Sequence, residues 1–169
     1  VLSTQLSVVV PFAVAGRPVT RIEVETRGIR SAPVVMPVAA TAPGIFTLAA
    51  NGSGPGAILN QNFTVNEPGN PAAPGSFVFL FATGGGVVTP ATPDGRLTQG
   101  VSNTVAPLLV EVDGQPAEVA YAGGAPDLIA GVLQVNIRLP ANLRPGNLPV
   151  VIRAASDTQS QPSVTVSVR

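Results

Sequence analysis

Acidic side chains are the only candidates for acid–base chemistry or metal binding in this chain, because the sequence has no histidine and no cysteine. Glu23 and Glu25 stand two residues apart in "RIEVET", so on a β-strand their carboxylates share one face. Such a pair could bind Ca²⁺ or serve as acid and base. Arg21 and Arg27 lie alongside in the sequence, and a solvated sheet face is the favoured interpretation.

The other motifs with chemical potential also have simpler explanations. Asp94, Asp113 and Asp127 fall in predicted turns, and no dense D-x-D or D-x-N-x-D motif surrounds them. The stretch "TGGGVV" (83–88) shares only its glycines with a phosphate loop, since no Lys-Ser/Thr follows and no βαβ unit surrounds it. These residues are therefore interpreted as turn and loop formers.

Two asparagines are candidate glycosylation sites. Asn51 and Asn62 begin the sequences "NGS" and "NFT", which fit the N-x-S/T sequon. The exclusive use of arginine as basic residue, with abundant Ala, Gly, Val and Pro, suggests a GC-rich bacterial genome. Modification of bacterial sequons is uncommon, so the unmodified state is favoured.

The missing residue types exclude several enzyme classes. Without cysteine and histidine, zinc, haem and iron–sulfur centres lose their usual ligands, and a Ser-His-Asp triad cannot form. All nine basic residues are arginines, which excludes a phosphate-binding lysine, a Schiff base and a Lys–Asn isopeptide crosslink. We therefore expect no cofactor, no metal site and no enzymatic activity. A carboxylate-based hydrolase is the weakest functional hypothesis.

The composition bears on partners. Charged residues form 11% of the chain and the net charge is zero, against roughly 25% charged residues in an ordinary soluble domain. Such a surface gives little repulsion between copies and favours association. The arginines are scattered, so no nucleic-acid partner is expected. No apolar run approaches the ~20 residues of a membrane helix, so no membrane span is expected.

Short β-rich runs alternate with turn residues along the whole chain. Glycine and proline number 18 each, and no window shows a sustained helical period. In "LQVNIRL" (133–139) the apolar residues share one face, which is typical of an antiparallel sandwich. Residues 83–106 are rich in Gly, Thr and Pro and indicate a long surface loop. Strands are expected near residues 5–12, 19–26, 33–39, 45–49, 57–65, 77–81, 108–112, 117–122, 132–139, 149–154 and 163–168.

The two ends of the chain carry a repeat. The same offset of 129 residues (134 − 5) separates Gln5 from Gln134, Pro11 from Pro140, Ser31 from Ser160 and Pro33 from Pro162. Each copy reads as a strand, a proline, a glycine turn, a second strand, Ser-x-Pro and a third strand, which indicates a tandem duplication. Only the second copy is preceded by a hairpin sequence, centred on Asp113-Gly114.

The repeat predicts the fold and its division. We expect an all-β chain of two Ig-like β-sandwich modules in tandem, the first lacking its opening strands. Residues 1–41 are expected to form this partial module, completed by another chain or by a preceding segment. Residues 42–169 are expected to form a complete Ig-like sandwich.

Several motifs resemble a known family: "APGIFT" (42–47), "NPAAPGSFVFLFATGGGVVTP" (70–90), "VEVDGQPAEVAYAGGAPDLIAGVLQVNIRLP" (110–140) and "PVVIRAASDTQSQPSVTVSVR" (149–169). Together they resemble a family of uncharacterised C-terminal Ig-like domains in large secreted proteins of acidobacteria. The family usually has "TGLGP" where this chain has "TGGGV", and its members extend upstream with a strand-rich half. The resemblance implies an Ig-like fold and an extracellular or cell-surface location, and it implies no catalysis.

A β-module that lacks strands leaves apolar side chains to be covered. The candidate self-association surface comprises Leu6, Val8, Val9, Val10 and Phe12. Covering four such side chains is worth roughly 6–12 kcal/mol.

The expected partners are copies of the chain in a head-to-tail homopolymer, or the N-terminal part of its own precursor. The expected function is a non-catalytic extracellular structural module that self-associates by strand complementation, as a filament or surface-layer subunit. The alternative is a ligand- or glycan-binding adhesion module of a larger secreted protein, acting through residues 83–106.

Overall fold

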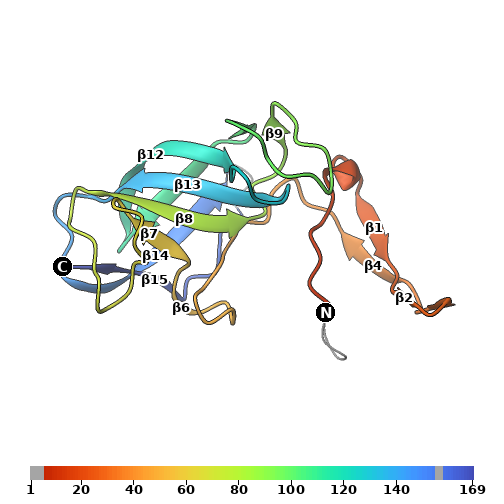
Figure 1. Cartoon of the computed structure of the whole chain (residues 1–169), viewed down its shortest axis with the longest axis horizontal. Helices are drawn as coiled ribbons and strands as arrows, with labels where there is room; N and C mark the ends of the chain where they lie inside the picture. The colour runs from red at the N-terminus through yellow and green to blue at the C-terminus, as the bar shows by residue number, and fades with distance from the viewer. Residues whose placement is uncertain (1–5, 155–157) are drawn as a thin grey trace.

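The chain folds as an all-β protein with two visibly different parts. The computed structural model describes residues 6–154 and 158–169, and within these ranges it contains strands and one 3₁₀ turn, η1 (Phe12–Val14). Figure 1 shows a β-sandwich formed by the chain from about residue 42 onward and a slender β-arm that projects from one end. The predicted all-β, sandwich-like architecture is confirmed.

The sandwich is built on one continuous path of hydrogen-bonded strands, and the pairs along it are antiparallel except the last, which is parallel. In spatial order the path comprises β5 (Gly44–Ile45), β8 (Phe77–Thr83), β13 (Val132–Arg138), β12 (Gln115–Gly124), β11 (Leu108–Val112), β14 (Gly146–Ala154), β15 (Val164–Val168) and β6 (Gly54–Pro55). Three short strands lie beside it: β7 (Ile58–Asn60), β9 (Val88–Thr89) and β10 (Asn103–Thr104).

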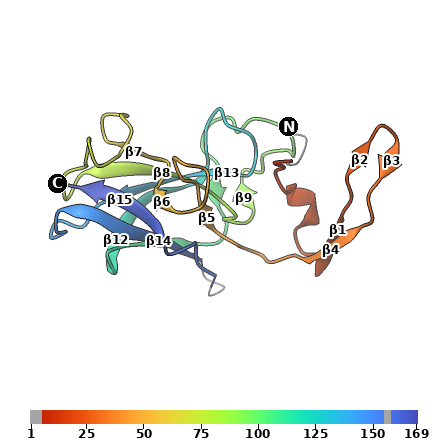
Figure 2. The ribbon, with the colours of Figure 1, turned by 90° about the horizontal axis from the view of Figure 1, so that it is seen from below.

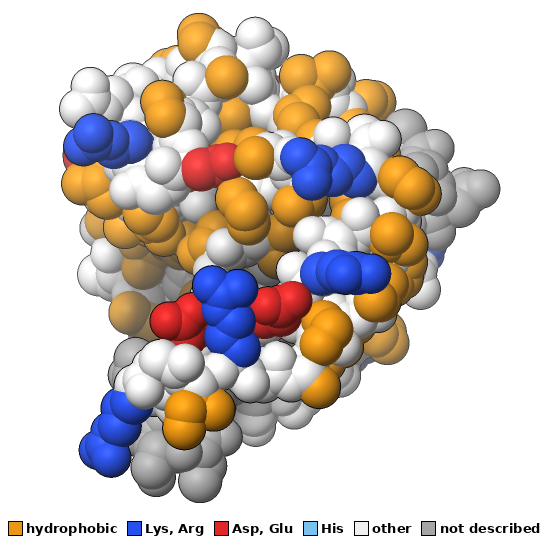
Figure 3. Space-filling view, turned by 90° about the vertical axis from the view of Figure 1, so that its right-hand side faces the viewer, with side chains coloured by type: hydrophobic (Ala, Val, Ile, Leu, Met, Phe, Trp, Pro, Cys, Tyr) orange, Lys and Arg blue, Asp and Glu red, His pale blue; other side chains and the backbone are white. Residues whose placement is uncertain are grey.

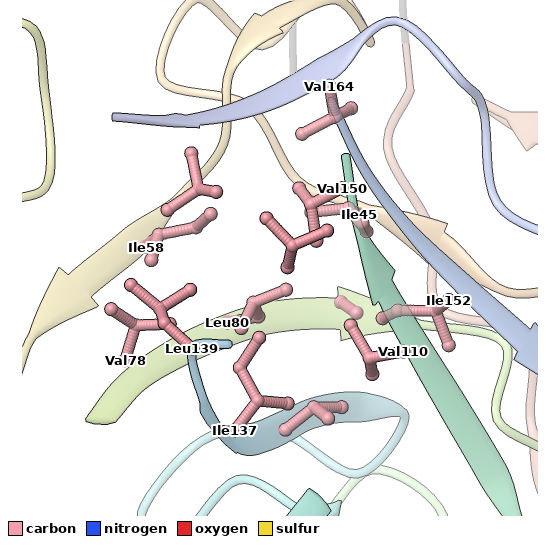
Figure 4. Close-up of a cluster of buried hydrophobic side chains, with 14 of the residues drawn as sticks. Ile45, Ile58, Val78, Leu80, Val110, Ile137, Leu139, Val150, Ile152 and Val164 are labelled. Carbon is pink, nitrogen blue, oxygen red and sulfur yellow. The ribbon is translucent and has the colours of Figure 1, made fainter. Parts of the chain in front are cut away.

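Alternation of side chains along the long strands produces the core. In β8, Val78, Leu80 and Ala82 are fully buried, while the residues between them are half-buried on the outer face. The same pattern occurs in β13 and β14. Figure 4 shows the result, with side chains from facing strands converging between the two layers.

Irregular segments close the ends of the sandwich path. The Thr47–Gly56 bridge and a hydrogen bond from the Leu48 N–H to the Pro55 carbonyl join the β5 end to the β6 end. On β15, the Ser167 carbonyl accepts from the Ala72 N–H at 2.9 Å. Its backbone groups are therefore paired beyond the short β6, and the edges of the path are covered.

The arm is a β-hairpin with a second, shorter hairpin at its tip. Strand β1 (Val19–Ile22) pairs with β4 (Val34–Pro37), and β2 (Glu25–Thr26) pairs with β3 (Ile29–Arg30). Figure 2 shows the arm extending away from the sandwich. Every residue of these four strands is exposed except Thr20, which is half-buried.

The predicted strand at residues 5–12 is wrong for its described part. Residues 6–11 form no strand, and η1 begins at Phe12. In the repeat, this segment corresponds to β13. Strand β13 has β8 on one side and β12 on the other. Residues 6–11 have neither neighbour among the described residues, so their strand propensity finds no backbone partner.

Candidate functional site

The candidate self-association residues are divided between exposed and half-buried positions. Leu6, Val8, Val9 and Val10 expose 46–73% of their surface. Phe12 instead packs against the core of the sandwich. The sandwich therefore already covers part of the surface that the sequence analysis assigned to a partner.

Two contacts hold this segment on the sandwich. The Asp94 carboxylate accepts hydrogen bonds from the backbone N–H groups of Phe12 (2.6 Å) and Ala13 (3.1 Å). Gly131 leaves space for Val9, since a Cβ on Gly131 would lie 2.5 Å from Val9 Cγ1. These contacts fix the base of the arm, so the arm starts from a defined position.

The arm itself carries exposed apolar side chains on both faces. Ile22, Val34 and Met36 are 43%, 56% and 44% exposed, and Val35 on the opposite face is 55% exposed. Figure 3 looks at this end of the molecule and shows hydrophobic side chains spread over it, with a group of acidic and arginine side chains among them. A lone two-stranded hairpin is marginal in water, so the arm is the part of the chain with most to gain from a partner.

The arm reproduces a detail of the β14–β15 hairpin. The Ser31 hydroxyl oxygen accepts from the Val24 N–H at 3.1 Å, and the Ser31 N–H donates to the Val24 carbonyl at 2.9 Å. In the sandwich, Ser160 makes the same two bonds with Ile152, at 3.0 and 2.8 Å. The Ser-x-Pro segments of the repeat therefore close two equivalent hairpins.

The two hairpins differ in their surroundings. Strand β14 pairs with β11 along five residues, and its Val150 and Ile152 are fully buried. The corresponding strand of the arm, β1, has β4 as its one neighbour among the described residues. The arm thus has the internal pairing of a sandwich hairpin without the strands that cover one.

The two free edges of the arm are not equivalent. The Val38 N–H donates to the Pro18 carbonyl. Because hydrogen-bonded pairs alternate along an antiparallel hairpin, the backbone groups of Thr20 and Met36 point toward each other, and those of Val19 and Arg21 point outward. On β4, the outward positions include Pro37, which has no N–H, and Pro33 precedes the strand. Prolines blunt a sheet edge, so β1 presents the open one.

The carboxylate pair Glu23 and Glu25 lies at the tip of the arm and is exposed. Arg30 Nε is 2.8 Å from Glu25 Oε2, and Arg30 Nη1 is 4.0 Å from Glu23 Oε2. Arg21 and Arg27 lie alongside in the sequence, and the ion-pair partner in the structure is Arg30, across the β2–β3 hairpin. The arrangement is an ion-paired surface, in keeping with the interpretation favoured from sequence.

The three candidate aspartates, Asp94, Asp113 and Asp127, have separate structural roles. Asp94 holds the base of the arm, and Asp113 forms a bidentate ion pair with Arg144 (2.9 and 3.1 Å). Asp127 occupies a turn with φ of 62°. In the part of the chain that the structure describes, no three acidic residues come together as a metal-binding group would require.

The glycines of "TGGGVV" serve close packing. Gly84 has φ of +74°, and a Cβ there would overlap the Ala42 carbonyl oxygen. Gly86 has φ of +80°, with the Ala40 carbonyl oxygen 2.7 Å from a Cβ position. Both glycines allow this loop to contact the segment that joins the arm to the sandwich.

Both sequon asparagines are exposed and form local turns. The Asn51 side-chain oxygen accepts from the Ser53 N–H at 3.0 Å. The Asn62 side-chain oxygen accepts from the Thr64 hydroxyl at 2.7 Å and from its N–H at 3.3 Å. Asn51 and Asn62 remain predicted sites of modification on accessible turns.

An aromatic surface on the outer face of β8 escaped the sequence analysis. Five of the six phenylalanines share this face, which we call the Phe face: Phe46, Phe63, Phe77, Phe79 and Phe81. Phe63 is 72% exposed, and its ring stacks on Phe79 with centroids 5.2 Å apart. The alternation of phenylalanine at 77, 79 and 81 with buried residues was the available signal.

The predicted surface loop at residues 83–106 contains the short strands β9 and β10, which pair with each other. Its residues 90–102 border an open hollow, lined by Pro90, Thr92, Arg96, Leu97 and Val101 among others. Arg96 is the one charged side chain in this lining. The rest of the lining is uncharged, so the hollow offers a single cation among polar and apolar groups.

Comparisons with known proteins add nothing to these observations. No family model, no curated protein and no solved structure matches the chain. Across residues 6–154 and 158–169, no helix has the length and apolar character needed to cross a membrane. The arm and the Phe face are the two features from which we infer a function.

Proposed function

We propose that the chain is a non-catalytic structural module that associates through β-strand complementation, and that the arm is the element requiring a partner. One observation carries the proposal. Val24 and Val35 in the arm are 41% and 55% exposed, whereas their counterparts in the sandwich hairpin, Ile152 and Val164, are fully buried. The segment that the repeat matches to the covered sandwich hairpin is uncovered in the arm.

Burial of side chains alone would give weak association. Five apolar side chains of β1 and β4 are about half exposed: Val19, Ile22, Val34, Val35 and Met36. Covering their exposed half contributes about 4–7.5 kcal/mol, from roughly 1.5–3 kcal/mol for each complete burial. Loss of translational and rotational freedom opposes binding by at least ~4 kcal/mol. Backbone hydrogen bonds to an added strand, as on β14, would supply the remainder.

The proposed partner is a second copy of the chain, which would generate a filament or a surface layer, or a segment of the same precursor N-terminal to the arm. The tandem Ig-like organisation and the extracellular, bacterial cell-surface location belong to this proposal. Support comes from the matched Ser31 and Ser160 hydrogen bonds, from the low charge of the surface and from the resemblance to secreted proteins.

Sedimentation velocity across a range of protein concentrations tests the proposal. We expect a concentration-dependent rise in sedimentation coefficient, weakened by Val34→Thr in the arm. Val101→Thr is the matched control, because Val101 is exposed on the sandwich at 67% against 56% for Val34. A monomer at every concentration would contradict self-association, and equal effects of the two variants would remove the arm from it.

A second candidate function, glycan or other ligand binding, is favoured by the Phe face. Stacked aromatic rings at the surface can pack against sugar rings, and Gln134 and Asn136 lie opposite Phe81 and Phe79 on the neighbouring strand. A glycan array tests this function, with Phe63→Ala as the variant. We expect any bound glycan to lose affinity in the variant; an array without binding would exclude glycans.

A further inference from the structure

Strand complementation requires an unpaired backbone edge, and the arm supplies it at β1. The path of the sandwich is closed at its ends by the Thr47–Gly56 bridge, and β4 is blunted by Pro33 and Pro37. The outward backbone groups of β1 belong to Val19 and Arg21. Among the described residues, the other strands with a single neighbour, β2, β3 and β9, are two residues long, so a second copy that adds a strand has the β1 edge as its longest available counterpart.

The alternation of inward- and outward-pointing backbone groups along β1 continues to Glu23. The Val24 N–H and C=O both bond to Ser31 and so face the other strand of the arm. Glu23, next to Val24, has its backbone groups on the outward side. The open edge thus carries a positive and a negative side chain, Arg21 and Glu23, at successive outward positions.

We propose that two copies pair through their β1 edges, antiparallel and in a register centred on Ile22. This inference rests on the proposed function and specifies one interface of it. The β1 pairing is symmetric and closes as a dimer, so growth into a filament or layer requires a second contact between dimers. In this register Arg21 of each copy lies opposite Glu23 of the other, whereas a register centred on Arg21 would place two arginines side by side. Opposite charges across a strand pair stabilise it and like charges destabilise it, so the edge is complementary to itself.

The same register extends the apolar face of the arm. Ile22 lies opposite Ile22 of the second copy, and Thr20 lies opposite Val24. Val34 and Met36 share this face on the adjoining strand, because they are paired with Ile22 and Thr20 within the arm. Two marginal hairpins then become one four-stranded sheet, which meets the size needed for a stable sheet with an apolar face.

Single-cysteine variants test the register, since the chain has no cysteine of its own. In the proposed register Ile22 forms a pair without backbone hydrogen bonds, with Cα atoms about 4.5 Å apart, which is within reach of a disulfide. We expect Ile22→Cys to form a covalent dimer under mild oxidation at least tenfold faster than Arg21→Cys. Faster crosslinking of Arg21→Cys would overturn the register.

Charge exchange provides an independent test on the full chain. Arg21→Glu should weaken dimer formation about tenfold in sedimentation velocity, and Arg21→Glu combined with Glu23→Arg should restore it. Arg17→Glu is the control, with the same change in charge before the strand begins. Oligomers unaffected by Arg21→Glu would overturn the β1 interface and leave the proposed function standing. A wild-type chain that stays monomeric would overturn the proposed function as well.

Discussion

The paired serines allow one hydrogen bond to be compared in two environments. Ser160→Ala removes the hydroxyl that accepts from the Ile152 N–H at 3.0 Å. Ser160 is 1% exposed and Ile152 is fully buried, so this N–H loses its partner where water cannot readily replace it. An unsatisfied buried donor costs about 1–3 kcal/mol of folding free energy.

Ser31→Ala deletes the equivalent bond to the Val24 N–H in the arm. Ser31 is exposed and Val24 is 41% exposed, so water can hydrate the freed N–H. We expect a loss of less than about 0.5 kcal/mol, as for an ordinary surface substitution. The same chemical change should thus give two clearly different stabilities.

Urea unfolding followed by circular dichroism, at a low protein concentration, measures the free energy of unfolding of both variants. At high concentration, Ser31→Ala should also weaken association, because a covered arm buries the same N–H. Equal destabilisation by the two substitutions at low concentration would refute the account of the arm as an uncovered hairpin.

Three further substitutions test the sandwich and its junction with the arm. Leu80→Ala should lower the free energy of unfolding by about 2–5 kcal/mol in urea titrations, because Leu80 is fully buried in the core; a loss below 1 kcal/mol would contradict this. Gly84→Ala should lower the melting temperature measured by calorimetry, since the residue has a φ of +74° and no space for a Cβ beside Ala42, and an unchanged value would argue against this close approach. Asp94→Ala should speed amide exchange at Phe12 and Ala13, whose N–H groups it binds; unchanged exchange would show that the base of the arm is held otherwise.

The sequence was most informative where one face of a strand is buried. The predicted strand 108–112 coincides with β11, and the predicted 132–139 differs from β13 by one residue. In both, alternate apolar residues point into one core, so local pattern and tertiary burial agree. The first strand failed because residues 6–11 have strand composition without strand neighbours, which a local pattern cannot reveal.

The candidate site was predictable only in part. The repeat predicted two strands joined through Ser-x-Pro near residues 19–39, and the structure has a hairpin there in which Ser31 bonds to Val24. The tandem duplication itself stays a prediction. The repeat assigned the exposed apolar surface to residues 6–12, whereas the arm strands carry a larger share, including Val34 and Met36. The Phe face arises from strands distant in sequence, β5 and β8, so its extent required the sheet register.

Residue-resolved amide exchange at low and high protein concentration tests the central claim most directly. The outward N–H groups of Val19, Arg21 and Glu23 have no partner strand among the described residues, so in a monomer they should exchange rapidly. We expect exchange at these three N–H groups to slow as protein concentration rises, while exchange at the inward N–H of Met36 changes little. Rapid exchange at Val19, Arg21 and Glu23 at every concentration would contradict association through this edge.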